Sequence, residues 1–249
     1  MEGADKMKNI VKIMKRAVLL ILVICVCSGF VIIGKGYMVY RDAIKTESLE
    51  EKVASIQEKE SYTEFEELPE VYVNAVVSVE DQRFFRHFGM DPIAVCRAVL
   101  HDIQAGAFVE GGSTITQQLA KNMYFSQEKE LTRKVAEAFV AFDLERNYSK
   151  EDIFELYVNS IYFGDGYYDV DTASQGYFGK DPGQMSEYEA TLLAGVPNAP
   201  SKYAPTKNPE LAAKRQLKVV ERMEDCGYFS ETEAETVAET VAVQMAARP

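Results

Sequence analysis

Three short segments of the sequence carry residues whose types and spacing could perform chemistry. In the first, the adjacent carboxylates Glu80 and Asp81 end an apolar stretch, and aromatic residues that could exclude water follow them. Burial against apolar surface favours the protonated form of a carboxyl group, and the raised pKa suits a general base. Acidic pairs are also common at exposed helix ends, so this pair alone does not define a site.

The second segment leads from the paired glycines Gly111 and Gly112 into a predicted helix. A helix N-terminus presents free backbone N–H groups and the positive end of the helix dipole, which together can bind an anion. Thr114, Gln118 and Lys121 then recur at helical spacing and share one face. An ordinary capped surface helix would explain this segment equally well.

The third segment spaces Lys129, Arg133 and Glu137 four residues apart, on one face of a predicted helix whose opposite face is apolar. Salt bridges along a solvent-exposed helix would explain this stripe if it stood alone. Together, the three segments supply two carboxylates, an anion site and three cations. This inventory suits displacement of a phosphate leaving group by a hydroxyl, since cations stabilise the leaving group and a carboxylate takes the proton.

The same segments resemble the ordered motifs of the peptidoglycan glycosyltransferases, glycosyltransferase family 51, which include a domain of the class A penicillin-binding proteins. The matching motifs are Glu80-Asp81-x-x-Phe84-x-x-His87-x-Gly89, Gly111-Gly112-Ser113-Thr114-Ile115-Thr116-Gln117-Gln118-Leu119-Ala120-Lys121-Asn122, Arg133-Lys134-x-x-Glu137-Ala138, Lys150-x-x-Ile153-x-Glu155-x-Tyr157-x-Asn159, Tyr177-Phe178-Gly179-Lys180 and the segment from Glu189 to Ser201. The resemblance covers roughly residues 65–230 and implies a mainly α, lysozyme-like glycosyltransferase domain.

The resemblance implies a reaction and a role for each motif residue. Glu80 would be the general base that deprotonates the 4-hydroxyl of an acceptor GlcNAc. Glu137 would be the second essential carboxylate, which orients the cations and the donor. The hydroxyl would attack the anomeric carbon of the donor MurNAc in lipid II and expel undecaprenyl diphosphate with inversion, giving a β-1,4 glycan strand. Sugar and phosphate contacts are implied for Ser113, Thr114, Gln118, Lys121, Lys129 and Arg133.

Expectations about a cofactor and partners follow from the same resemblance. A divalent cation, Mg²⁺ or Mn²⁺, would bind mainly through the substrate diphosphate, with Asp81 as a candidate protein ligand. Phe84 and His87 would be architectural. The expected partners are lipid II, the growing glycan chain, the membrane, and penicillin-binding proteins or other wall-synthesis proteins. A net charge of −12 argues against nucleic acid as a partner, because a nucleic-acid binder needs a basic surface.

Two positions depart from the family pattern. Asp169 stands where the family usually has glycine, and Lys129 stands where an arginine is sometimes found, which removes bidentate geometry there. The Ser126-x-x-Lys129 spacing of transpeptidases is interpreted as chance, because no Lys-Thr-Gly follows. We therefore expect a monofunctional transglycosylase, unless the sequence is part of a longer bifunctional protein. A glycan-cleaving muralytic enzyme and an inactive scaffold of a wall-synthesis complex are the alternatives.

One apolar segment precedes the elements that would position these residues. Residues 17–34 contain no charged side chain, and a helix of that length spans about 27 Å, close to a bilayer core of about 30 Å. Residues 1–16 hold five bases and two acids, whereas residues 35–249 hold 22 bases and 37 acids. The positive-inside tendency then predicts a cytoplasmic N-terminus and an extracytoplasmic body.

An uncleaved anchor is favoured over three other interpretations of residues 17–34. The apolar run continues past Gly29, which argues against a cleaved signal peptide, and Ile24 and Val26 are too large to precede a lipoprotein cysteine. A buried core helix rarely lacks a polar face over such a length. In the body, Cys96 and Cys226 could pair in an oxidising compartment, but two buried free thiols are the preferred interpretation.

The sequence as a whole predicts four parts: a cytoplasmic basic tail over 1–16, an anchor over 17–34, a helical stalk over 35–67 and a glycosyltransferase domain over 68–249. Strand signals are few, and helix-start signals are frequent. These starts lie at Asp91-Pro92, Thr114, Ser149, Ser186, Asn208-Pro209 and Ser230. By the resemblance, the apolar stretches near 93–100 and 107–109 correspond to a membrane-dipping part of the fold.

Overall fold

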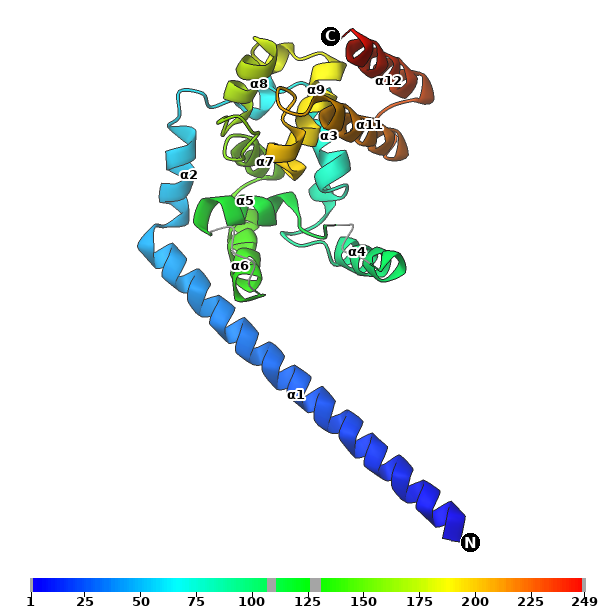
Figure 1. Ribbon diagram of the computed structural model, residues 1–249. Helices are drawn as coiled ribbons and strands as arrows, with labels where there is room; N and C mark the ends of the chain where they lie inside the picture. The colour runs from blue at the N-terminus through cyan, green and yellow to red at the C-terminus, as the bar shows by residue number, and fades with distance from the viewer. Residues whose placement is uncertain (1, 107–110, 126–130, 248–249) are drawn as a thin grey trace.

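The computed structural model describes residues 2–106, 111–125 and 131–247, and this part of the chain is built from helices without a named strand (Figure 1). The α-helices are α1 (Glu2–Thr46), α2 (Leu49–Gln57), α3 (Glu70–Glu80), α4 (Pro92–Ala105), α5 (Ile115–Tyr124), α6 (Leu131–Asn147), α7 (Lys150–Val158), α8 (Val170–Phe178), α9 (Glu187–Gly195), α10 (Pro200–Tyr203), α11 (Pro209–Asp225) and α12 (Glu231–Ala246). Short 3-10 turns lie at Phe65–Glu67, Phe84–Arg86, Pro182–Gln184 and Val196–Asn198. The mainly α fold expected from the sequence is confirmed.

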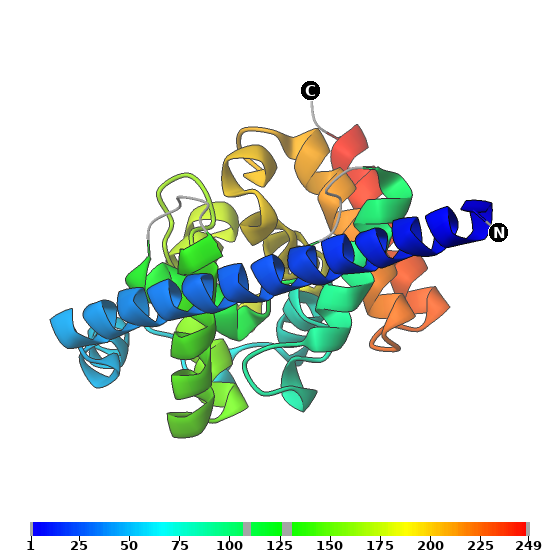
Figure 2. The ribbon, with the colours of Figure 1, turned by 90° about the horizontal axis from the view of Figure 1, so that it is seen from below.

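Helix α1 projects from the body as one long rod that ends at the N-terminus (Figures 1 and 2). Its part from Lys12 to Thr46 contains an 18-residue window of mean hydropathy 3.0, and none of that window is buried. Apolar side chains between Val18 and Ile33 are exposed along the rod. An exposed apolar helix of this length indicates membrane anchoring, as the sequence predicts.

The segment predicted as a stalk, residues 35–67, contains the end of α1, helix α2 and a 3-10 turn, and its helices pack against the body. Residues up to Thr46 continue α1 and pack against α6, and α2 places Leu49, Val53 and Ile56 in the hydrophobic core. The charge-rich composition obscures these apolar residues, because they recur only every three or four positions on one helical face. The body therefore begins well before residue 68.

The core surrounds α3, which packs against α9 and α11. Tyr72, Ala75 and Val76 of α3 are at most 1% exposed, so each stabilises the fold by removing apolar surface from water. α5 packs against α6 and α7 beside this group. Because α3 is held on several sides, its last residue, Glu80, has a fixed position at the end of a buried helix.

Five of the six predicted helix starts are confirmed by capping hydrogen bonds, and α11 begins at Pro209 as predicted, although the Asn208 side chain makes no capping hydrogen bond. Thr114, Ser149, Ser186 and Ser230 each form a capping box at the start of α5, α7, α9 and α12. The carboxylate of Asp91 accepts from two backbone N–H groups at the start of α4, where a proline occupies the first turn. These local bonds determine where the helices that border the site begin.

Candidate active site

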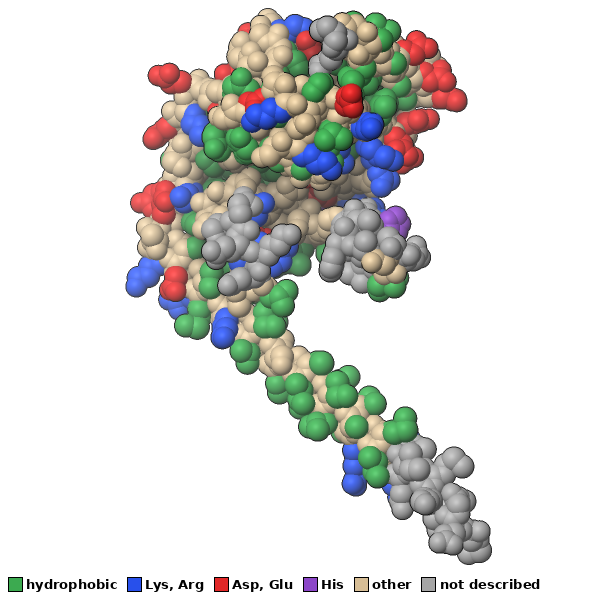
Figure 3. Space-filling view, in the orientation of Figure 1, with side chains coloured by type: hydrophobic (Ala, Val, Ile, Leu, Met, Phe, Trp, Pro, Cys, Tyr) green, Lys and Arg blue, Asp and Glu red, His purple; other side chains and the backbone are tan. Residues whose placement is uncertain are grey.

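A cleft of about 510 Å³ lies where the end of α3 meets α4, the start of α5 and α11. Figure 3 shows basic side chains above the hollow that separates the upper body from α4. The residues that line the cleft are Ser78, Val79, Glu80, Asp81, Gln82, Arg83, Asp91, Ala94, Arg97, Gly111, Gly112, Ser113, Thr114, Gln118, Lys121, Pro197, Asn198, Arg215, Lys218 and Arg222. Cations outnumber carboxylates in this lining, although the whole chain carries a net charge of −12.

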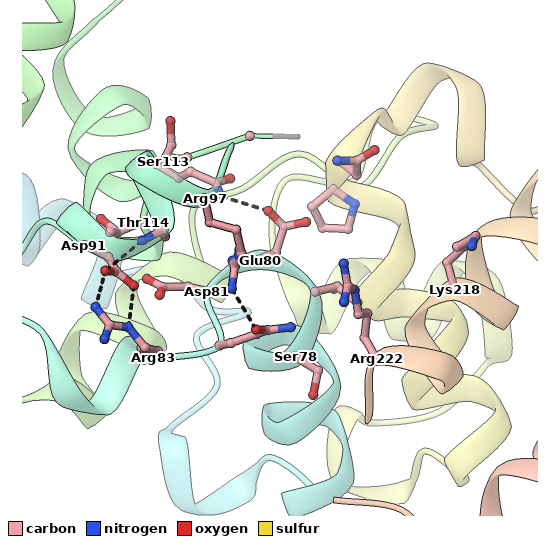
Figure 4. A pocket seen from close by; sticks show the side chains of 18 of the residues that line it. Ser78, Glu80, Asp81, Arg83, Asp91, Arg97, Ser113, Thr114, Lys218 and Arg222 are labelled. Atoms are coloured by element: carbon pink, nitrogen blue, oxygen red, sulfur yellow. Dashed lines mark hydrogen bonds and ion pairs between the residues drawn. The ribbon is translucent and has the colours of Figure 1, made fainter. Parts of the chain in front are cut away.

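Glu80 lies at the centre of the cleft, between the other labelled side chains of Figure 4. Its Oε2 accepts a hydrogen bond of 2.8 Å from Nε2 of Gln118, and its Oε1 lies 3.7 Å from Arg215. The Oε1 atom is buried and has no hydrogen-bond partner in the described part of the chain. Burial raises the pKa of the Glu80 carboxyl, Asp81 adds to this rise, and Gln118, Arg215 and Lys121 oppose it.

The carboxylate of Asp81, the neighbour of Glu80, makes contacts within the protein. Its Oδ2 accepts from the backbone N–H of Ile115 at 3.0 Å and lies 2.8 Å from Nε2 of His87. Phe84 is fully buried, and the His87 ring lies edge-on to it. These contacts fix the end of α3 against the start of α5, in agreement with the architectural roles expected for Phe84 and His87.

The start of α5 brings a glycine-rich loop to the cleft. A Cβ atom on Gly112 would lie 3.3 Å from the Cα of Val95, so glycine allows the loop to approach α4 closely. The Thr114 hydroxyl accepts from the Gln117 N–H at 3.1 Å and donates to the Gly89 carbonyl at 2.7 Å. Thr114 is 2% exposed, so its hydroxyl is already committed to contacts within the protein.

Two other side chains of α5 face the cleft, as the helical spacing predicts. Gln118 bridges Glu80 and the Tyr157 hydroxyl, which donates to its Oε1 at 3.4 Å. Lys121 also lines the cleft. Burial lowers the pKa of Lys121, and the nearby cations of α6 lower it further, whereas Glu137 and Glu80 raise it. Lys121 therefore lies within the field of both carboxylates.

Glu137 lies on α6 beside this cleft, but it is not among the residues that line it. It is 1% exposed and pairs with Arg133 at 3.2 Å and with Lys134 at 2.9 Å. Lys134 also donates to the Ser113 hydroxyl at 2.7 Å, which ties α6 to the loop before α5. The buried Glu137 carboxylate therefore contacts two cations, and one of them, Lys134, reaches the loop before α5.

Several basic residues of the cleft were not singled out by the sequence analysis. Arg215 lies on α11. Lys218 and Arg222 project from the same helix, and Arg97 projects from α4 (Figure 4). Arg215 also donates from Nε to the Gly195 carbonyl at 3.4 Å. The spacing of the three α11 residues is helical, but nothing local in the sequence shows that this face of α11 meets Glu80.

Lys129, one of the three cations expected at the site, lies outside the described residues. Asp169 caps α8 by accepting from the Thr172 N–H at 2.7 Å, so its carboxylate organises the loop in which the family usually has glycine. Cys96 and Cys226 are free thiols, but Cys96 is exposed and Cys226 is partly exposed, so the expectation that they are buried is wrong.

Comparison with known proteins decides the family. A sequence profile described as Transglycosylase matches residues 47–224. This chain belongs to the transglycosylase family. Penicillin-binding protein 1A of Aquifex aeolicus (strain VF5) is 47% identical over 173 residues, which are 70% of this chain and 24% of that protein. Penicillin-binding protein 1F of Bacillus subtilis (strain 168) is 43% identical over 187 residues, which are 75% of this chain and 26% of that protein.

The transglycosylase match begins at residue 47, inside the segment that packs α2 into the core. The chain spans about a quarter of the length of these curated relatives. A crystal structure of penicillin-binding protein 1A from Haemophilus influenzae is 26% identical with a TM-score of 0.34, covering 50% of this chain and 15% of that one.

Proposed function

We propose that this protein is a peptidoglycan glycosyltransferase that polymerises lipid II into β-1,4 glycan strands and releases undecaprenyl diphosphate. The observation that carries the proposal is the position of Glu80, a buried carboxylate in a cleft whose other charged side chains are mainly basic. Membership of the transglycosylase family supports the reaction class. The lipid-linked substrate and the inverting single displacement are parts of this proposal.

Glu80 acts as the general base. A hydroxyl of the acceptor sugar that donates to Oε1 would satisfy an oxygen that has no hydrogen-bond partner within the described chain. Gln118 holds the other oxygen, so the carboxylate cannot rotate freely. The hydroxyl proton passes to Glu80 while the hydroxyl oxygen forms a bond to the anomeric carbon of the donor, and the bond from that carbon to the diphosphate breaks.

The cations stabilise the charge that gathers on the departing diphosphate. Lys121 lies in the cleft with Glu80, and Arg133 and Lys134 lie beside it on α6, held by the buried Glu137. Fixed cations in a partly dehydrated site stabilise such a charge more than water does. Glu137 contributes by orienting these groups.

A divalent cation remains part of the proposal. Among the described residues, no group of three or more His, Cys, Asp or Glu side chains could hold a metal ion. Asp81, the candidate ligand, already accepts from Ile115 and contacts His87 through one oxygen. These residues fit a cation that binds through the substrate diphosphate, where it would neutralise charge, better than one held in a protein cage.

Polymerisation of lipid II by the detergent-solubilised full chain tests the proposal, with glycan length and free undecaprenyl diphosphate as readouts. Glu80→Gln should lower the rate by about 10²–10⁴-fold, because it removes the proton acceptor. Glu70→Gln, at the exposed start of the same helix, is the matched control and should polymerise normally. Normal chain growth by Glu80→Gln would contradict the role of Glu80. Release of soluble muropeptides from cell wall would favour a muralytic enzyme instead.

A further inference from the structure

The contact between α1 and α6 has no part in the chemistry proposed above. Gly36 of α1 is buried, and a Cβ on it would lie 2.5 Å from the Cβ of Val135 and 2.8 Å from the carbonyl oxygen of Thr132. Such distances leave no space for a side chain, so the two helix backbones are as close as glycine permits. The approach lies two residues beyond the apolar span that ends at Gly34.

Aromatic and polar contacts extend this close approach along α1. The Tyr37 ring meets Phe139 edge-on with centroids 5.3 Å apart, and the Tyr40 ring lies 5.5 Å from Phe139. The Tyr40 hydroxyl donates to the carboxylate of Asp143. The contact therefore covers about one turn of α1 and about three turns of α6, and it combines packing with a directional hydrogen bond, which disfavours sliding of one helix along the other.

One face of α6 contacts the cleft region, and another face contacts α1. At about 100° per residue, Glu137 lies about 40° from Arg133 in one direction around the helix, whereas Asp143, Phe139 and Val135 lie about 80°, 120° and 160° from Arg133 in the other direction. One face therefore carries the buried Glu137 and its cations toward the cleft. The other face carries the contacts to α1. A rigid helix between them transmits the position of α1 directly to the cation-bearing face.

The depth of these groups relative to a bilayer follows from helix geometry. Gly36 lies about 3 Å along the helix axis from the last residue of the apolar span, Gly34. The first turn of α6 is therefore held at the level where the span ends, and its exposed Leu131 agrees with that level. In Figures 1 and 2, α6 lies beside the part of α1 where the rod leaves the body.

We propose that the contact of Gly36, Tyr37 and Tyr40 with α6 is a spacer that sets Arg133 and Glu137 at the height of membrane-bound phosphate groups. The inference rests on the proposed function, because the diphosphate of a lipid-linked sugar lies at the membrane surface. Gly36, Tyr37 and Tyr40 are thus positioning residues, which act through α6 and touch no reacting atom.

An insertion tests the spacer without disturbing the contact itself. A polar helical segment of about seven residues between Gly34 and Lys35 would raise the body by about 10 Å while nearly preserving the helical phase. The matched control is the same segment inserted between Lys15 and Arg16, on the other side of the apolar span. Both full-length variants and the wild type are reconstituted in vesicles and assayed on bilayer-embedded lipid II and on a water-soluble short-chain analogue.

If the contact is a spacer, the insertion after Gly34 should reduce activity on the bilayer-embedded substrate only. The Gly34 insertion should lower kcat/KM on bilayer-embedded lipid II by about tenfold or more and leave the soluble analogue unaffected, and the Lys15 insertion should change neither. Equal activity of both insertions on both substrates would overturn the spacer, and so would an equal loss on both substrates. If the wild type polymerises neither substrate, the proposed function fails, and the spacer fails with it.

A substitution at the contact gives an independent measurement. Gly36→Leu forces α1 away from α6, whereas Gly34→Leu is the matched control because nothing lies within 4 Å of a Cβ at that position. Gly36→Leu should raise KM for bilayer-embedded lipid II by about tenfold with a smaller change in kcat. A fall in kcat alone, or the same effect from Gly34→Leu, would contradict the inference. A thermal melt separates these outcomes from unfolding.

Discussion

At the scale of single residues, the environment of Glu80 determines what its carboxylate can do. Burial raises its pKa above the ordinary value of 4.5, and a hydrogen bond from Gln118 together with the nearby Arg215 and Lys121 limits the rise. A carboxylate whose pKa is raised in this way is a stronger proton acceptor than an exposed glutamate. The same burial makes the charged form costly to the folded state.

The first residue-scale prediction concerns pH. Because the unprotonated carboxylate is the base, kcat/KM should fall as pH decreases through the raised pKa of Glu80, so the acidic limb lies above pH 4.5. Arg215→Gln removes a cation that favours the charged form and should move this limb to higher pH. Arg215→Lys should leave it closer to the wild type. A profile of log kcat/KM against pH for the three proteins provides the measurement, and a downward shift in Arg215→Gln would contradict the prediction.

The sign of the same pKa shift predicts a stability effect. The folded state binds a proton more readily at Glu80 than the unfolded state does, so stability from this group falls as pH rises through the interval between the two pKa values. Glu80→Gln removes the cost of the buried charge. The variant should therefore unfold at neutral pH at the same temperature as the wild type or higher, although it is inactive. A marked decrease in its Tm would show that Glu80 stabilises the fold.

Lys134 gives a second residue-scale prediction. Its ammonium contacts both Glu137 and Ser113, but its side chain is 43% exposed, so solvent screens part of the interaction. Lys134→Met should cost about 1 kcal/mol of stability and reduce polymerisation, because Glu137 and the loop lose their link. Lys214→Met, at an exposed position of α11, is the control. Urea unfolding and the lipid II assay measure the two effects, and unchanged activity in Lys134→Met would exclude the linking role.

At the scale of elements, the start of α5 is fixed from three directions. Asp81 accepts from its first N–H group, Thr114 caps it and also donates to Gly89, and Gly112 lets the preceding loop approach α4. Each contact joins segments that are separated in the chain. The start of α5 is therefore held in one place relative to Glu80, which is what a preorganised site requires.

Substitution of Thr114 tests whether its role is structural. Thr114→Ala removes the cap and the hydrogen bond to Gly89, so it should lower the free energy of unfolding by about 1–2 kcal/mol. Thr114→Ser keeps the hydroxyl and should restore most of that free energy. Ser230→Ala removes the equivalent cap of α12 and should lower stability without changing activity. Thermal melts and polymerisation rates provide the comparison. If Thr114→Ser keeps full stability but loses activity, the threonine contacts the substrate, as the family resemblance implies.

At the scale of the whole molecule, charge and hydropathy are separated along the chain. The exposed apolar rod of α1 divides a basic tail from an acidic body, and the cysteines are distributed between these parts. Cys25 and Cys27 lie within the apolar span, whereas Cys96 is exposed on α4. The native thiols therefore report which side of a membrane the body occupies.

Labelling of intact cells tests the expected orientation. A membrane-impermeant maleimide should modify the wild type through Cys96, because the positive-inside tendency predicts an extracytoplasmic body. Cys96→Ser should lose most of the label, and a Cys25→Ser, Cys27→Ser double variant should be labelled like the wild type. Labelling of Cys96 only after the cells are permeabilised would reverse the orientation.

The sequence by itself determined features that depend on neighbouring residues. The apolar span, the helix starts, and the grouping of Gln118 with Lys121 and of Arg133 with Glu137 follow from composition, capping and helical periodicity. Each of these signals lies within a few turns of helix. The family resemblance added roles to those positions, because its motifs are also local in sequence.

Only the tertiary structure decided which faces meet. Arg215 comes more than a hundred residues after Glu80, and its proximity depends on α11 packing against α3. Asp81 accepts a hydrogen bond from the first residue of α5, and Gly36 packs against the backbone and side chains of α6. Periodicity shows which residues share a face of one helix, but the partner of that face is set by the collective packing of the core, which has no local signature in the sequence.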